Sequence, residues 1–133
     1  MADVYEYAVI RVVPDLIREE FLNAGAVVLC EARAYLGAVA ALDEARLAAF
    51  APTVDVDVVR AHVDAILRVC RGEGPMGALA VRERFRWVVS PRNAIVQTSC
   101  AHGGVTDDPD AALARIVERV VKGPGASNRR GAP

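Results

Sequence analysis

The chain has 133 residues, of which 53% are hydrophobic and 5% aromatic, with 16 basic and 17 acidic side chains. This length suffices for one domain with one apolar core, and the balanced charge excludes a global field that would attract nucleic acid or an anionic membrane. No apolar run reaches the roughly 20 residues needed to span a bilayer. The N-terminus carries no basic leader or signal-like stretch, and three widely spaced cysteines favour reduced thiols. We therefore expect a cytoplasmic protein.

The first third of the chain predicts strands. Residues 5–13 are rich in β-branched side chains and end at Pro14, which has no N–H to donate to a sheet. Residues 16–23 fit either a helical turn or an extended segment. Residues 26–30 form a continuous apolar run, which predicts a buried strand. Residues 34–42 follow a charged turn and are expected to pair with residues 26–30 as an antiparallel hairpin.

Two helices are expected in the middle of the chain. Residues 43–50 end shortly before Pro52 and predict a short helix. Asp55 is a suitable N-cap for a longer helix, which Gly72 ends. The apolar side chains of this longer helix recur at helical spacing and fall on one face. They are Val59, Val63, Ile66, Leu67 and Cys70.

The last third combines both patterns. Residues 81–89 alternate between apolar and arginine-rich positions, which favours a strand, although a helix could begin within residues 76–84. Residues 90–104 are interpreted as a turn, a short buried strand and a loop that ends in glycine. Asp108 then caps a final helix, and Pro109 occupies its first position.

This order of elements predicts an α+β fold, in which helices pack mainly on one face of an antiparallel sheet. Residues 1–122 are expected to form a single domain. Residues 123–133 are rich in Gly, Pro, Ser and Asn and predict a disordered C-terminal tail. Because an incomplete sheet leaves edge strands open to pairing, the chain could also form a homodimer.

Residues 90–104 hold the first candidate site. Arg92 offers a planar group for a carboxylate or phosphate, Gln97 a neutral hydrogen bond, and His102 a group that gains or loses a proton near neutral pH. If they converge, they could bind an anionic ligand. The alternative is structural: Arg92 pairs with Asp15 or Glu20, while Gln97 and His102 satisfy loop backbone groups.

A second group of polar side chains brackets Pro14. It comprises Arg11, Asp15, Arg18, Glu20 and Asn23. Asp15 and Glu20 could work as an acid pair on a substrate or a metal. They could equally pair with Arg11 and Arg18 beside a turn at Asn23, and we favour this second interpretation because surface ion pairs are common.

Arg82, Arg84 and Arg86 form a row of basic side chains at alternate positions, with Trp87 beside them. On a strand they would give a basic face for an acidic protein partner, and arginine and tryptophan are enriched at interface hot spots. Single-stranded nucleic acid needs aromatic rings on the same face as the cations, whereas strand alternation turns Trp87 to the opposite face. We therefore regard the row as a candidate protein interface and nucleic-acid binding as the weaker interpretation.

The chain lacks the common motifs of catalysis and cofactor binding. Cys100 and His102 are two neighbouring metal-ligand types where a zinc site needs three or four. Neither a Gly-x-Ser-x-Gly nucleophile motif nor a phosphate-binding glycine loop is present. We therefore predict no metal and no cofactor, and we lean against an enzyme.

Several separated motifs occur in the same order as in one bacterial family. They are Arg-Val-Val-Pro-Asp at 11–15, Glu-Phe-Leu-Asn-Ala-Gly at 20–25, Arg84-Phe85-x-Trp87, Ser90-Pro91-Arg92, Gln97, His102-x-Gly104 and Asp107-Asp108-Pro109. From Tyr5 to Val121 the chain resembles the family known as "domain of unknown function 3037". Its members are often encoded beside a kinase-like protein of the HipA type, so the resemblance implies such a partner. The family carries no assigned activity, so the resemblance implies no reaction.

These observations lead to two hypotheses. The first is a non-catalytic accessory or protein-interaction module of a bacterial cytoplasmic system, acting with a partner such as a HipA-type kinase-like protein. The second is a small enzyme or ligand-binding domain that recognises a carboxylate or phosphate through Arg92, Gln97 and His102. A deep pocket at these residues would favour the second, and a flat apolar patch would favour the first.

Overall fold

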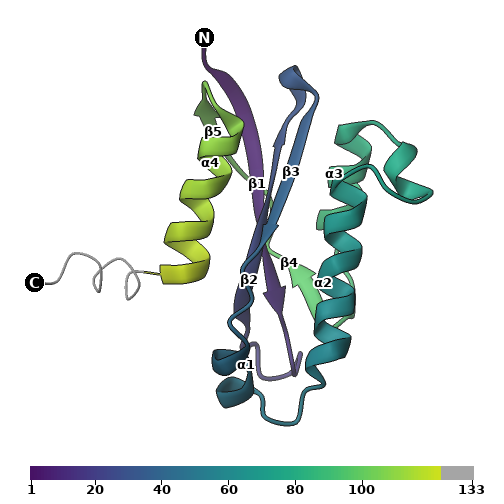
Figure 1. The fold of residues 1–133 in the computed structure, drawn as a ribbon, viewed down its shortest axis with the longest axis vertical. Coiled ribbons are helices and arrows are strands. Elements are labelled where there is room, and N and C mark those ends of the chain that lie inside the picture. The colour runs from purple at the N-terminus through teal and green to yellow at the C-terminus, as the bar shows by residue number, and fades with distance from the viewer. Residues whose placement is uncertain (124–133) are drawn as a thin grey trace, which may run out of the picture.

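The computed structural model describes residues 1–123, which form a five-stranded antiparallel sheet with helices on both faces (Figure 1). The strands are β1 (Asp3–Val12), β2 (Leu22–Cys30), β3 (Tyr35–Ala40), β4 (Val96–Thr98) and β5 (His102–Thr106). β1 pairs with β2 along one side and with β4 and β5, one after the other, along the opposite side. β3 pairs with the outer side of β2. The predicted α+β class and antiparallel sheet are confirmed.

Two of the four helices that the structure describes begin at the caps predicted from the sequence, Asp55 and Asp108. The four are α1 (Glu44–Phe50), α2 (Val56–Cys70), α3 (Val81–Val89) and α4 (Pro109–Ile116), and wider π-type turns continue α4 over Val117–Lys122. Short 3₁₀ turns occupy Glu31–Arg33 and Met76–Ala78. Aspartates precede three of these helices, and each carboxylate accepts a hydrogen bond from a backbone N–H of the first turn. These aspartates are Asp43, Asp55 and Asp108.

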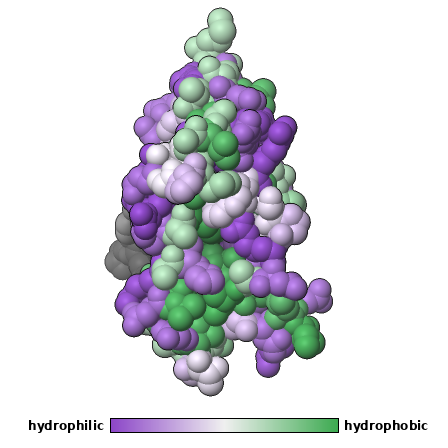
Figure 2. Space-filling model, turned by 90° about the vertical axis from the view of Figure 1, so that its right-hand side faces the viewer, coloured by the Kyte–Doolittle hydropathy of each residue, from purple (hydrophilic) through white to green (hydrophobic). Residues whose placement is uncertain are grey.

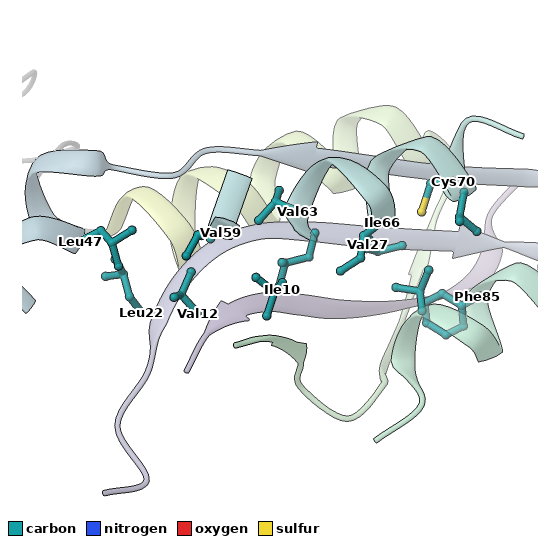
Figure 3. Close-up of a cluster of buried hydrophobic side chains, with 14 of the residues drawn as sticks. Ile10, Val12, Leu22, Val27, Leu47, Val59, Val63, Ile66, Cys70 and Phe85 are labelled. Atoms are coloured by element: carbon teal, nitrogen blue, oxygen red, sulfur yellow. The ribbon is translucent and has the colours of Figure 1, made fainter. Parts of the chain in front are cut away.

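The main core lies between one face of the sheet and helices α1, α2 and α3. Figure 3 shows Ile10, Val12, Leu22 and Val27 of the sheet facing Leu47 of α1, Val59, Val63, Ile66 and Cys70 of α2, and Phe85 of α3. The predicted apolar stripe of α2 is thus confirmed, with Leu67 only partly buried. Burial of this stripe is the main reason that α2 is stable, because isolated helices of its length are marginal in water.

The opposite face of the sheet carries a smaller cluster. Ala26 and Val28 of β2 pack there against α4 and the turns that follow it, which contribute Leu113, Ile116, Val117 and Val121. Figure 1 shows α4 on this side of the sheet, with α2 and α3 on the other. Most helices therefore pack on one face, as predicted, and α4 covers part of the second face.

The prediction of a strand over residues 81–89 is wrong, because this segment is helix α3. Val81, Phe85 and Val89 are spaced by four residues, which satisfies the period of a strand and of a helix alike. Burial separates the two, since Phe85 and Val88, three residues apart, both lie in the core with 2% and 1% exposure. Only a helix brings such a pair to one face.

Strand β2 is longer than predicted. It starts at Leu22, four residues before the apolar run, because a β-bulge opposite Ile10 and Arg11 lets the polar Asn23 join the strand.

Within residues 1–123, no helix is long and apolar enough to cross a membrane. The predicted C-terminal tail lies, beyond Gly123, outside the described residues.

Candidate functional site

Arg92 is committed to the end of α3. Its guanidinium group donates hydrogen bonds to the carbonyls of Trp87 and Val88 and lies 4.8 Å from the centre of the Trp87 ring. These carbonyls belong to the last turn of the helix, where they have no partner within the helix and where a positive charge is favourable. Arg92 therefore caps α3, and its partners are these carbonyls rather than Asp15 or Glu20.

Gln97 and His102 lie opposite different residues of β1. Gln97 on β4 is opposite Arg11, whereas His102 on β5 is opposite Tyr7, with its ring centroid 5.3 Å from that of the tyrosine. Four residues of strand separate Arg11 from Tyr7, which corresponds to about 13 Å. His102 is exposed, and its Nε2 lies 3.9 Å from the Sγ of Cys100. The structure does not bring His102 to Gln97.

A different set of candidates does come together. Arg11, Asn23 and Gln97 are direct neighbours on three adjacent strands, with Arg11 in the middle. Ile10 and Val12 point into the main core, so the side chain of Arg11 points to the α4 face. We call Arg11, Asn23 and Gln97 the Arg11 row.

The Arg11 row contains two buried polar atoms that have no hydrogen-bond partner within residues 1–123. They are Nε of Arg11 and Oδ1 of Asn23. The Nδ2 of Asn23 does donate, to the carbonyl of Val120 after α4, at 3.1 Å. The guanidinium carbon of Arg11 lies 3.9 Å from the centre of the Phe21 ring. A planar cation held by an aromatic ring, with an N–H still to satisfy, is suited to a carboxylate or phosphate.

The predicted acid pair does not face this row. The Oδ1 of Asp15 accepts a hydrogen bond from the backbone N–H of Ile17 at 2.9 Å, which closes a local turn. Glu20 pairs with Arg18 at 2.7 Å, and this hydrogen bond raises the pKa of Arg18. Both carboxylates are exposed.

Asp15 and Glu20 instead lie on an open pocket of about 770 Å³ at the end of β1. The pocket is formed by three separate segments, 13–20, 50–54 and 93–95. Large apolar side chains on it are exposed to solvent, namely Leu16 (48%), Ile17 (91%) and Phe50 (37%). On the face of the molecule shown in Figure 2, hydrophobic side chains gather in the lower part. We call this pocket, with the exposed side chains of Leu16, Ile17 and Phe50, the apolar end.

The predicted arginine row is not one surface, because α3 is a helix. Arg82 forms ion pairs with Glu6 at 2.6 Å and Glu31 at 3.0 Å, which tie α3 to the sheet and raise the pKa of Arg82. Arg84 donates to the last carbonyls of α2. Arg86 is exposed, and Trp87 is half-buried against the main core. Only Arg86 therefore presents its charge freely to a partner.

Sequence reasoning missed the apolar end and the contact of Arg11 with Phe21. A signal was present in residues 14–21, where Leu16, Ile17 and Phe21 occur in a segment too short and too polar for a buried element. The sequence interpretation considered only the polar residues of this segment, whereas its exposed apolar side chains are the ones that indicate a binding surface.

A family model described as protein of unknown function (DUF3037) matches residues 7–121 of the 133. The matched range runs from the middle of β1 to the turns after α4, so it contains the Arg11 row and the segments of the apolar end. No curated protein and no solved structure matches the chain.

Proposed function

We propose that this chain, which belongs to the DUF3037 family of proteins of unknown function, is a protein-interaction module of a bacterial cytoplasmic system. The apolar end is the observation that carries the proposal. Leu16, Ile17 and Phe50 are exposed together around an open pocket. Exposed apolar side chains that adjoin in this way, with polar groups at the rim, are typical of surfaces that bind other proteins.

The charges around the apolar end specify the chemistry of the partner. Among the residues that line the pocket, Asp15 and Glu20 are acidic and Arg18 is basic. A partner segment with apolar side chains flanked by Lys or Arg would complement both the pocket and its rim. Such complementarity speeds encounter and selects among partners. The kinase-like protein of the HipA type that the family resemblance implies is our first candidate.

Binding of the purified chain to the purified candidate partner, measured by calorimetry, tests the proposal. Ile17→Ser removes the most exposed apolar side chain of the apolar end and should weaken binding by about tenfold or more, or about 1.4 kcal/mol. Leu79→Ser is the matched control. Like Ile17, Leu79 has a branched aliphatic side chain that is exposed, at 37%, but it lies outside the pocket.

Equal affinity of the Ile17→Ser and wild-type chains would show that the apolar end is not the binding surface. If the HipA-type protein does not bind, the same pair of variants is used in co-purification from the source cells. A partner retained by Leu79→Ser and lost by Ile17→Ser supports the proposal. Absence of any such partner rejects it.

The Arg11 row supports a second function, recognition of an anionic ligand. Arg92 is unsuited to this role because it caps α3, whereas Arg11 has no ion pair within residues 1–123 and keeps a buried Nε unpaired. Asn23 and Gln97 flank it on both sides. A carboxylate or phosphate at this position would satisfy the Arg11 donors in a partly desolvated setting, where charge-assisted hydrogen bonds are strong.

Titration with inorganic phosphate and with acetate, followed by NMR of the side-chain amides, tests this second function. We expect the signals of Asn23 and Gln97 to shift with a saturable dependence on one of the two anions, and Arg11→Met to abolish the shift. Arg86→Met is the matched control, because Arg86 is an exposed arginine on another element. Shifts that persist in Arg11→Met, or that never saturate, would exclude the site.

A further inference from the structure

The two outer edges of the sheet differ in protection. β3 has α2 and α3 against one face and α4 against the other, so helices flank its outer edge. Within residues 1–123, β1 is the one element against which β5 packs extensively. Figure 1 shows β5 at the upper end of the sheet. An uncovered edge presents backbone N–H and C=O groups that another strand can bind.

The backbone groups of β1 show which residues of β5 point outward. The N–H of Ser99 donates to the carbonyl of Val9, so odd-numbered residues of β1 direct their backbone groups toward β4 and β5. Tyr5 is one of these residues, and it is opposite Gly104. Gly104 therefore uses its backbone groups within the chain.

The next residues on either side of Gly104 have the opposite orientation. Gly103 and Val105 direct their N–H and C=O groups away from β1, to the open edge. Natural proteins protect such edges with lysine, proline or a bulge. Residues 102–106 contain neither lysine nor proline.

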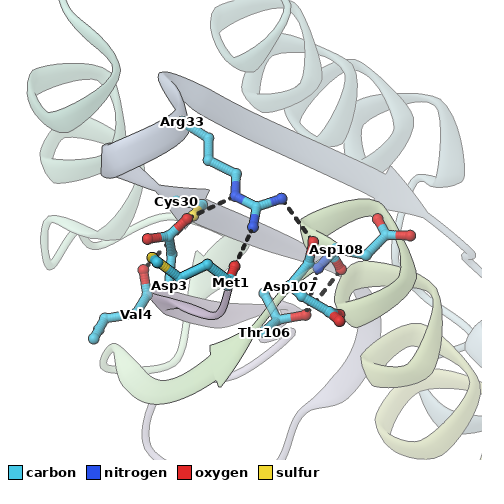
Figure 4. Close-up of polar contacts among 8 residues, drawn as sticks. All are labelled: Met1, Asp3, Val4, Cys30, Arg33, Thr106, Asp107 and Asp108. Atoms are coloured by element: carbon cyan, nitrogen blue, oxygen red, sulfur yellow. Dashed lines mark hydrogen bonds and ion pairs between the residues drawn. The ribbon is translucent and has the colours of Figure 1, made fainter.

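This edge is also held in place. Arg33 donates to the carboxylate of Asp3 at 2.8 Å, to the carbonyl of Met1 at 2.9 Å and to the carbonyl of Asp107 at 2.7 Å (Figure 4). One guanidinium group thus ties the start of β1 to the residue that follows β5. A strand fixed in this way loses little conformational entropy when it pairs.

The side chains beside the edge are apolar and exposed. Val4 and Val105 are direct cross-strand neighbours with 70% and 66% of their surfaces exposed. Two such valines adjoining an open edge form a surface that a further strand would cover.

We propose that β5 pairs antiparallel with β5 of a second copy of this chain, about a two-fold axis at Gly104. In this register Gly103 of each copy exchanges backbone hydrogen bonds with Val105 of the other, so the larger side chain meets a glycine. His102 then lies opposite Thr106, and no like charges meet, because residues 102–106 contain no Lys, Arg, Asp or Glu. The Val4 and Val105 pairs of both copies join into one apolar strip. A surface that is complementary to itself favours a second copy over an unrelated chain.

This inference is independent of the proposed function. β5 pairs with the first residues of β1, whereas the apolar end adjoins Val13 at its other end. The dimer would leave both apolar ends open, and it would present two of them to a partner that also has two binding segments.

Size-exclusion chromatography with light scattering of the full chain tests the pairing. We expect twice the monomer mass of 14.2 kDa for the wild type and the monomer mass for Val105→Pro. Proline at 105 removes an outward N–H and leaves the hydrogen bonds to β1 intact. Ala40→Pro is the matched control: Ala41 donates to Ala24, so Ala40 directs its N–H to the outer edge of β3. That variant should remain a dimer.

Amide hydrogen exchange of the wild type provides a measurement that does not depend on any variant. Protection of the Gly103 and Val105 amides that rises with protein concentration supports the pairing, even if Val105→Pro fails to fold. A monomeric wild type, a dimeric and folded Val105→Pro, or fast exchange of both amides at every concentration would overturn it.

Discussion

The face of the sheet toward α1, α2 and α3 buries a large apolar cluster, whereas the face toward α4 buries a smaller one and leaves polar atoms unpaired. On the first face Arg84 of α3 and Arg92 of the loop after it have partners, since both donate to helix carbonyls. On the second face, Nε of Arg11 and Oδ1 of Asn23 are buried without partners within residues 1–123. Unsatisfied buried groups cost free energy, and a ligand that pairs with them would recover that cost.

The difference suggests a division of roles within one small fold. The first face supplies the apolar burial that stabilises the chain, and the second face retains groups that a ligand could satisfy. Four measurements would break or sharpen this comparison.

The largest expected effect is that of truncating Phe85 in the main core. Phe85→Ala should lower the free energy of unfolding by about 3–5 kcal/mol, because it removes a fully buried ring and leaves a cavity. Leu113→Ala on the α4 face should cost about 2–3 kcal/mol, since the smaller cluster can collapse more easily. Urea unfolding measures both. A larger loss for Leu113→Ala would reverse the assigned roles of the faces.

Alkaline pH should lower the free energy of unfolding through the thiol of Cys70, which lies in the main core. Burial raises the pKa of this thiol to about 11, from an ordinary value of 9.0. Between these pH values the unfolded chain loses the proton and the folded chain keeps it. The free energy of unfolding should therefore be constant below pH 9.0 and fall by about 2 kcal/mol as the pH approaches 11.

Cys70→Ala should remove that part of the alkaline slope, whatever its effect at neutral pH. Burial and the hydrogen bond to Asp110 also raise the pKa of Tyr35, which contributes a loss of the same sign and remains in the variant. Unfolding by urea at a series of pH values checks both chains. Identical slopes for the two would show that Cys70 is not the group responsible.

Removal of the cap on α3 should have an intermediate effect. Arg92→Ala should lower the free energy of unfolding by about 1–2 kcal/mol, because helix carbonyls lose a charged donor. Arg86→Ala should change it by less than about 0.5 kcal/mol, as expected for an exposed side chain. Thermal unfolding of the two variants, matched in chemistry, distinguishes structural from surface arginines. Equal losses would contradict the assignment.

The smallest expected effect is that of Arg11→Met, and its sign is informative. Methionine retains much of the apolar contact with Phe21 and removes the unpaired Nε, so the free energy of unfolding should stay unchanged or rise by about 1 kcal/mol. A clear loss of stability in urea would mean that Arg11 is a structural residue. Arg11 would then not be available to bind a ligand on the α4 face.

The accuracy of sequence reasoning varied with the range of the interactions involved. The helices that start at Asp55 and Asp108 were predicted with their caps, because a cap and the turn it satisfies are neighbours in the chain. The hairpin of β2 and β3 was predicted for a similar reason. Residues 81–89 were not, since a short segment fits two periods and only its neighbours in space select one.

The candidate site followed the same rule. The sequence identified Arg11, Asn23 and Gln97 as polar groups of interest, but Arg11 and Gln97 are 86 positions apart in the chain, and only strand pairing makes them neighbours. It grouped Arg92 with Gln97 and His102 because they are close in the chain. Arg92 instead caps the helix that precedes it.

The sequence alone determined the α+β class, the family, the approximate extents of β1, β3, α1, α2 and α4, and the caps at Asp55 and Asp108, because these depend on composition, motif order and contacts within a few residues. Only the tertiary structure decided which polar groups remain unpaired, where Ile17 is exposed and which edge of the sheet is open. These features depend on which distant segments pack together. Pairing between distant strands is set by the free energy of the whole fold, and no local stretch of residues encodes it.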